Sequence, residues 1–257
     1  MDTSFFEPAG PGSYLATDAT SGPWDPRAQH GGPPSALAAR ELDRHEPDEN
    51  MRLARVSVDI LRPVPIGPLT ARTRTLRPGK RVALLETVLE AGGQEVLHAR
   101  GWRLSISDVP QVGAAGVAPS IPAAGEPPRF PGGHVSGYLS QIEWRFVAGN
   151  IAEPGPCRVW ARPRLPLLPA EELSPMSRAL LLSDSGSGVS MVLDPREFLF
   201  INVDLTVVLQ RDLVGEWLML DAVSTMGGTG TGLSETSIWD TSGMAGLAMQ
   251  TLLVGPR

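Results

Sequence analysis

Arg52-Leu-Ala-Arg-Val-Ser-Val-Asp-Ile-Leu-Arg62 is the stretch that decides the fold class. From Val56 to Ile60 apolar and polar residues alternate, which is typical of a strand with one face buried. Turns rich in Pro and Gly separate it from three more strand-like runs, at 68–77, 81–90 and 94–106. Short turns join antiparallel strands, so this region predicts an antiparallel sheet.

A helix is predicted immediately before these strands. The stretch from Pro33 to Arg44 begins with two prolines, which suit the first turn of a helix. Ala36, Leu37 and Leu42 then form a narrow apolar stripe at helical spacing. The first half of the chain therefore predicts one amphipathic helix lying on an antiparallel sheet.

The second half of the chain repeats this plan. A helix is predicted over 174–184, where Ser174 is a good N-cap and Pro175 occupies the first turn. Strand-like runs lie on both sides of it, at 138–148, 157–164, about 200–209, 216–225, 229–239 and 244–254. Two copies of a helix and an antiparallel sheet, joined edge to edge, would leave fewer open sheet edges. The expected class is α+β.

Residues 107–133 separate the two copies. Proline and glycine are so frequent there that neither a helix nor a central strand can persist. We therefore expect an N-terminal unit at 1–106, a linker at 107–133 and a C-terminal unit at 134–257.

Composition excludes several functional classes. The net charge of −6 and the pI of about 5.3 argue against nucleic-acid binding as the main function. Cys157 is the only cysteine, so no intrachain disulfide or cysteine-rich zinc site can form. The apolar runs are far shorter than the roughly 20 residues of a membrane span. We expect a cytoplasmic protein without a metal or another cofactor.

Several segments resemble the thioesterase II-like acyl-CoA thioesterases. The resemblance covers about residues 13–254 and is carried by Trp24-Asp-Pro-Arg-Ala-Gln-His-Gly-Gly-Pro-Pro-Ser-Ala-Leu-Ala-Ala39, Ile60-Leu-Arg-Pro-Val-Pro65, Arg77-Pro-Gly-Lys-Arg81 and Gly92-Gly93. It implies a double hotdog fold, in which two fused units each wrap an antiparallel sheet around a central helix. It also implies hydrolysis of an acyl-CoA to a carboxylic acid and CoA.

The resemblance also implies a catalytic trio in the second half. Asp184, Thr225 and Gln250 match the order of the family's residues, and the glycine-rich stretch 226–232 departs from the family pattern. A carboxylate can serve as the base for an attacking water, and hydroxyl and amide groups can hold that water in place. Near the first helix, His30, Gly31 and Gly32 are expected to contact the substrate, and the glycines allow close backbone approach.

Two other functions remain open from the sequence. A hydratase or dehydratase could move protons through His30, and a module that binds acyl-CoA or lipid could lack catalysis altogether. The trio favours the thioesterase, because no matching set of polar residues occurs in the first half. An acyl-CoA is the expected partner, and a homodimer is compatible with exposed sheet surfaces.

Overall fold

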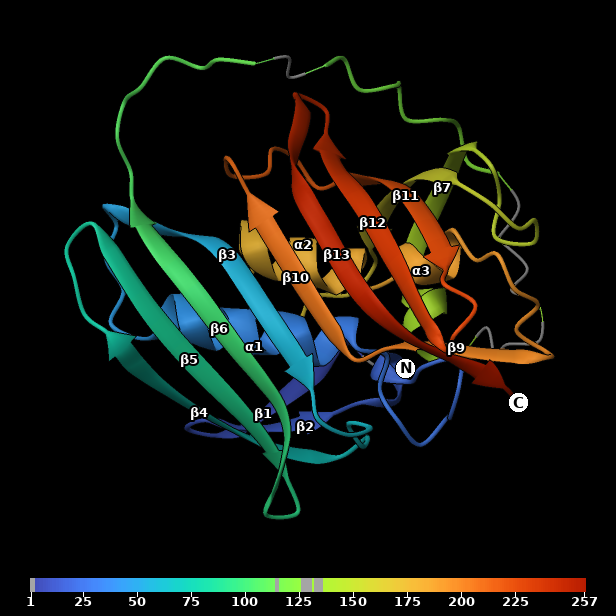
Figure 1. The fold of residues 1–257 in the computed structure, drawn as a ribbon. Helices are drawn as coiled ribbons and strands as arrows, with labels where there is room; N and C mark the ends of the chain where they lie inside the picture. The colour runs from blue at the N-terminus through green and yellow to red at the C-terminus, as the bar shows by residue number, and fades with distance from the viewer. Residues whose placement is uncertain (1–2, 114–115, 126–130, 132–135) are drawn as a thin grey trace.

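The computed structural model describes residues 3–113, 116–125, 131 and 136–257. Each half contains one main helix, α1 (Gly32–Arg44) and α2 (Pro175–Ser183), and a short helix α3 (Gly186–Val189) follows α2. Single 3-10 turns lie at η1 (Asp18–Thr20) and η2 (Gly137–Gln141). All other regular structure in the described residues is β-strand (Figure 1).

The strands form one antiparallel sheet in which the two halves follow the same path. The first half runs in the order β1-β2-β4-β5-β6-β3 and the second in the order β10-β13-β12-β11-β8-β7. The first-half strands are β1 (Phe6–Gly10), β2 (Ser13–Ala16), β3 (Met51–Ile60), β4 (Pro68–Arg77), β5 (Val82–Ala91) and β6 (Gln94–Ser105). The second-half strands are β7 (Ile142–Ala148), β8 (Cys157–Pro163), β9 (Phe198–Asn202), β10 (Asp204–Leu209), β11 (Leu218–Met226), β12 (Thr231–Asp240) and β13 (Gly243–Pro256).

The two halves join where β3 pairs with β10. Ser57 lies opposite Thr206 in this register, and their hydroxyl groups are 3.1 Å apart. Val56, Val58, Leu205 and Val207 are buried on the other face of the same pair. This alternation keeps the junction in one register, because a shift by one residue would expose all four apolar side chains.

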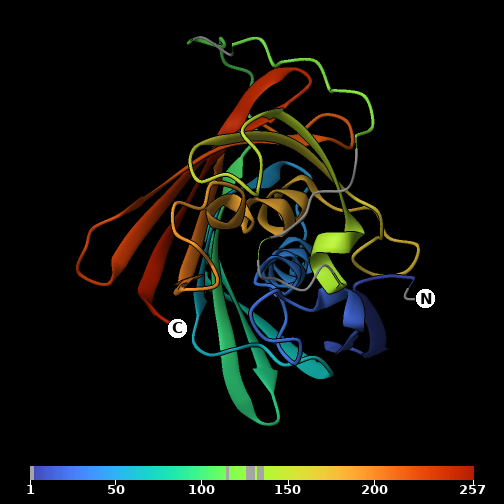
Figure 2. The ribbon, with the colours of Figure 1, turned by 90° about the vertical axis from the view of Figure 1, so that its right-hand side faces the viewer.

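Helices α1 and α2 lie side by side and antiparallel on the concave face of the sheet (Figure 2). Small residues let them approach closely, and the Ser177 hydroxyl donates to the backbone oxygen of Ala36 at 3.1 Å. Leu37, Leu42 and Leu180 are fully buried between the helices and the sheet. The antiparallel packing brings the N-terminus of α1 to the C-terminus of α2.

The structure confirms the two predicted helices and refines the strands. The run expected at 200–209 is two strands, because the chain bends at Val203 and both β9 and β10 pair with β13. The Asp204 carboxylate accepts the Thr251 backbone N–H at 2.6 Å beside this break. Strands β1 and β2 were not predicted, because Pro8 and two glycines interrupt their apolar pattern.

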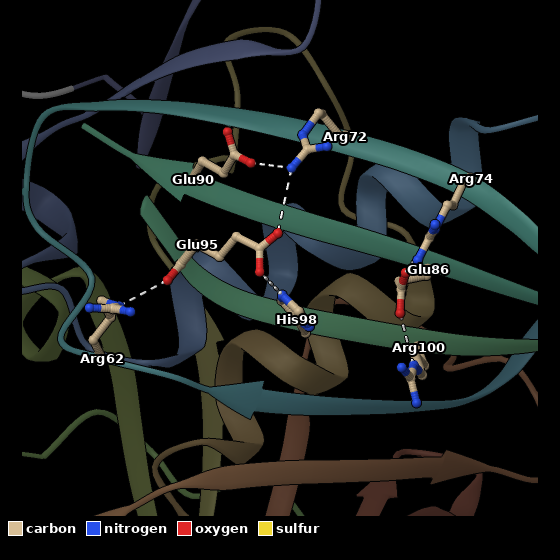
Figure 3. Close-up of polar contacts among 8 residues, drawn as sticks. All are labelled: Arg62, Arg72, Arg74, Glu86, Glu90, Glu95, His98 and Arg100. Atoms are coloured by element: carbon tan, nitrogen blue, oxygen red, sulfur yellow. Dashed lines mark hydrogen bonds and ion pairs between the residues drawn. The ribbon is translucent and has the colours of Figure 1, made fainter. Parts of the chain in front are cut away.

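The outer face of the first-half sheet carries a network of paired charges, shown in Figure 3. Glu86 is covered by Arg74 and Arg100, whose guanidinium groups both bind its carboxylate. Burial alone would raise the pKa of Glu86, and the two arginine hydrogen bonds outweigh it and lower that pKa. His98 belongs to a second cluster on this face, where it binds Glu95 at 2.9 Å and Glu95 also pairs with Arg72 (Figure 3).

After β6, residues 106–113 and 116–125 run past one end of the sheet toward the second half (Figure 1). Within this segment the described residues form no helix or strand. Of the predicted linker, residues 114–115, 126–130 and 132–133 lie outside the described residues. Among the described helices none has the length and apolar character needed to cross a membrane.

Candidate functional site

Asp184 lies at the C-terminal end of α2, where that helix meets the start of α1. Its backbone is still helical, with φ −60° and ψ −21°, so the side chain points across toward α1. The residue is 4% exposed. A buried carboxylate requires hydrogen-bond donors, and the surrounding elements supply them.

Side chains from the loop before α1 and from β9 hold the Asp184 carboxylate. Nδ1 of His30, in the loop before α1, is 2.7 Å from Oδ2. The amide of Asn202, at the end of β9, donates to Oδ1 at 2.8 Å. The Gly32 backbone N–H lies 3.2 Å from the same Nδ1 of His30, and the positive end of the α1 dipole also favours a negative charge here.

Gly31 and Gly32 are required by the closeness of the two helix ends. A Cβ atom at Gly31 would lie 2.9 Å from Oδ2 of Asp184. A Cβ atom at Gly32 would overlap the backbone oxygen of Leu181 in α2. The glycine pair therefore allows the contact between the helices and the position of the carboxylate.

Adding a methyl group should mainly affect catalysis at Gly31 and stability at Gly32. We expect Gly31→Ala to displace the carboxylate and lower kcat by about 10- to 100-fold, because a small misplacement of a reacting group is costly. Gly32→Ala should instead lower the free energy of unfolding by about 1–3 kcal/mol, because the new methyl group would force the backbone of α1 or α2 to move. Steady-state kinetics and urea unfolding measure the two effects.

Gly255→Ala is the matched control for this pair. Gly255 lies near the end of β13, and a Cβ atom there would meet nothing within 4 Å. Its activity and stability should stay close to those of the wild type. Full activity in Gly31→Ala would contradict the close fit of Asp184 against the α1 terminus.

Gln250 is buried and links the C-terminal end of α2 to α3. Its Nε2 donates to the backbone oxygen of Asp184 at 3.0 Å and lies 3.4 Å from Oδ1 of the carboxylate. Its Oε1 accepts the backbone N–H of Ser187 in α3 at 3.1 Å. The structure therefore brings Gln250, Asp184 and His30 together, and Gln250 fixes the backbone that carries Asp184.

Thr225 does not join these residues, which corrects its expected position. Side chains alternate between the two faces of β11, and Thr225 is exposed on the outer face. Its neighbour Ser224 is 5% exposed on the inner face, where it bonds the Ser190 hydroxyl at 2.8 Å. Thr225 is therefore too poorly placed to hold a water beside Asp184.

Asn202 is the polar partner that the sequence reasoning missed. It ends the apolar run of β9 and lies opposite Leu252 of β13. A polar residue at the end of an apolar strand, close in sequence to Asp184, was the available signal. The split of the predicted strand at Val203 concealed which way its side chain points.

A largely apolar cavity of about 350 Å³ opens beside Asp184. Asp184, His30, Gly31 and Asn202 belong to the polar part of its wall, together with the charged side chains of Asp25, Arg62 and Arg257. Apolar side chains from both halves form most of the remainder: Trp24, Ile60, Val64, Leu139, Ile151, Val189, Met191 and Phe200. A concave apolar space with a few convergent polar groups is the usual form of a small-molecule site.

The opposite end of the helix pair has a related arrangement with different chemistry. There Ser174, before α2, donates to the Asp43 carboxylate at 2.6 Å. Burial raises the pKa of Asp43, and the Ser174 hydrogen bond partly offsets this. Arg103 binds the Leu42 and His45 backbone oxygens, much as Gln250 binds that of Asp184. Among the described residues, no histidine side chain is paired with the Asp43 carboxylate.

Two other kinds of chemistry lack support in the described residues. Burial raises the pKa of the Cys157 thiol to about 12, so the reactive thiolate is scarce at neutral pH. No group of three or more His, Cys, Asp or Glu side chains in the described part of the chain could hold a metal ion.

Solved structures resemble this chain over nearly its whole length. A protein of unknown function with a hot dog fold from Alicyclobacillus acidocaldarius is 15% identical, with a TM-score of 0.74 over 100% of this chain and 97% of that one. The acyl-CoA thioesterase II TesB2 from Mycobacterium marinum is 17% identical, with a TM-score of 0.67 over 98% and 96%. The tesB protein from Mycobacterium avium subs paratuberculosis is 17% identical, with a TM-score of 0.68 over 99% and 97%. These similarities show a hotdog-type fold.

Sequence models of protein families identify the chain more directly. Residues 20–104 match the acyl-CoA thioesterase N-terminal domain, and residues 118–254 match the acyl-CoA thioesterase C-terminal domain. No curated protein sequence matches the chain. Because the two models together account for most of its length, the chain belongs to the acyl-CoA thioesterase family and is a thioester hydrolase.

Proposed function

We propose that this protein hydrolyses an acyl-CoA to the free carboxylic acid and CoA by attack of a water that Asp184 assists. The observation that carries the proposal is the Asp184 carboxylate, held by His30 and Asn202 at the wall of the apolar cavity. An oriented carboxylate in a site of low polarity can assist the removal of a proton from water, either directly or through a neighbouring group. The apolar remainder of the cavity suits an acyl chain.

The oxyanion of the tetrahedral intermediate also needs a donor. The backbone N–H of Gly31 has no hydrogen-bond partner among the described residues, and Gly31 lines the cavity. It lies at the N-terminus of α1, where unpaired N–H groups and the helix dipole favour negative charge. We assign the oxyanion to this N–H, which requires the thioester carbonyl to approach the α1 terminus.

Residues 1–106 and 134–257 are proposed as the two units of a double hotdog. The shared strand order and the single helix in each half support this division. The family matches also divide the chain between residues 104 and 118. The site would then lie between the units, with His30 from the first and Asp184 from the second.

Hydration of an enoyl-CoA is a second candidate, favoured by the contact between His30 and Asp184. A histidine paired with a carboxylate can deliver or remove a proton during addition of water to a double bond. One end of the helix pair has the contact between His30 and Asp184, and the other has Ser174 on Asp43. This difference between the two ends is equally compatible with hydration.

Crotonyl-CoA distinguishes the two reactions in a single tube. Hydrolysis releases free CoA thiol, which a thiol reagent detects, and hydration removes the enoyl absorbance without releasing thiol. We expect thiol release from crotonyl-CoA or from a saturated acyl-CoA of matching length. Loss of the enoyl absorbance without thiol would favour the hydratase, and binding of acyl-CoA without either change would indicate a binding module.

A further inference from the structure

The imidazole ring of His30 is held in one orientation. Its Nδ1 contacts the Asp184 carboxylate at 2.7 Å, and the ring stacks on Tyr138 with centroids 3.9 Å apart and planes 18° apart. The Gly32 N–H also points at Nδ1 as a donor at 3.2 Å, but a ring nitrogen cannot accept there and donate to Asp184 at once, and the shorter contact is with the carboxylate. The proton of the neutral ring therefore belongs on Nδ1, which leaves Nε2 as an acceptor.

Asp184 is poorly placed to receive a proton from water directly. Its side chain is 2% exposed, whereas that of His30 is 12% exposed. Asn202 occupies Oδ1 and His30 occupies Oδ2. Nε2 of His30 has no hydrogen-bond partner among the described residues, and His30 lines the cavity.

We infer that His30 is the catalytic base of the proposed hydrolysis and that Asp184 assists by orienting the ring and stabilising its charge. The inference rests on the proposed function and names the atom, Nε2, that accepts the proton. A buried carboxylate bonded to Nδ1 fixes the required tautomer and stabilises the imidazolium as it forms. His30 thereby changes from an expected substrate contact to a reacting group.

The steps balance with water as the only co-substrate. The water oxygen bonds to the thioester carbonyl carbon while one of its protons passes to Nε2. The carbonyl electron pair moves to oxygen, where the Gly31 N–H can donate to it. When that pair returns, the C–S bond breaks, and the proton on Nε2 passes to the leaving sulfur. The products are the carboxylic acid and CoA thiol, and the ring is neutral again.

Tyr138, which stacks on the ring, does not compete with Nε2 for the proton. Burial raises the pKa of Tyr138 far above neutrality, so its hydroxyl stays uncharged. The charged groups that line the same cavity, besides Asp184, are Asp25, Arg62 and Arg257.

His30→Asn tests this assignment. An asparagine amide can replace the donor at Nδ1, so it can still bond Asp184, but it offers no base at Nε2. We expect kcat for CoA release to fall by about 10²- to 10⁴-fold, with KM changed only a few-fold. The control is His98→Asn on the outer face of the sheet, which should keep wild-type kinetics.

Two outcomes would overturn the account at different levels. Wild-type protein that releases no CoA would refute the proposed function. Active wild type together with a His30→Asn protein that keeps its rate would refute only the role of His30. If His30→Asn does not fold, His30→Gln replaces it, because its amide also lacks a base. A folded His30→Gln protein whose kcat stays within about tenfold of the wild type would overturn the inference.

Discussion

Asp184→Asn is expected to lower kcat by about 10³- to 10⁴-fold. Asn202 donates to Oδ1, so the new side chain should turn its own oxygen toward Asn202 and its amide toward His30. Nδ1 must then accept, and the ring proton moves to Nε2. The tautomer that can accept a proton from water is lost, together with the charge that stabilises the imidazolium.

Steady-state CoA release at saturating acyl-CoA measures this effect. Asp221→Asn provides the matched control, because Asp221 pairs with Arg158 on the outer face of β11, away from the cavity. The control should keep the wild-type kcat. An Asp184→Asn protein that is folded and within about tenfold of wild type would contradict a central role for this carboxylate.

Gln250→Ala should have the second large effect, on both stability and rate. The substitution leaves the Asp184 backbone oxygen and the Ser187 N–H without a partner in a buried site. Each of the two unsatisfied groups costs about 1–3 kcal/mol, so the free energy of unfolding should fall by about 2–6 kcal/mol. The end of α2 would also be less firmly held, which should lower kcat by about tenfold or more.

Thr225→Ala is the control for Gln250→Ala, because Thr225 lies on the outer face of the sheet. Because Thr225 is exposed, its removal should change the free energy of unfolding by less than about 0.5 kcal/mol and leave kcat unchanged. Urea unfolding and CoA release compare the two variants. Equal effects of Gln250→Ala and Thr225→Ala would contradict the positions described for these side chains.

The fold was largely predictable because local patterns determine most of its elements. The strand over 68–77 was placed at its observed bounds by the turns around it, and the helix over 33–44 by its prolines and narrow apolar stripe. Long-range pairing was less accessible. The break at Val203 depends on how β9 and β10 each meet β13, which the strand pattern of 200–209 does not reveal.

The site was only partly predictable, for reasons of geometry. Gln250 stands out because a polar group within an apolar run needs a partner, whereas Asp184 was predicted from the family resemblance. Ser224 and Thr225 are adjacent and chemically alike, so the phase of β11 alone decides which one faces the helices. The contact of His30 with Asp184 depends on the antiparallel packing of α1 and α2, which brings residues far apart in sequence together.

The most direct test of the central claim is release of CoA from short-, medium- and long-chain acyl-CoAs by the wild type and by Asp184→Asn in parallel. The account predicts release that depends on chain length, since one apolar cavity of about 350 Å³ receives the acyl group, and its loss in the variant. No release by the wild type from any chain length, or equal release by both proteins, would contradict it.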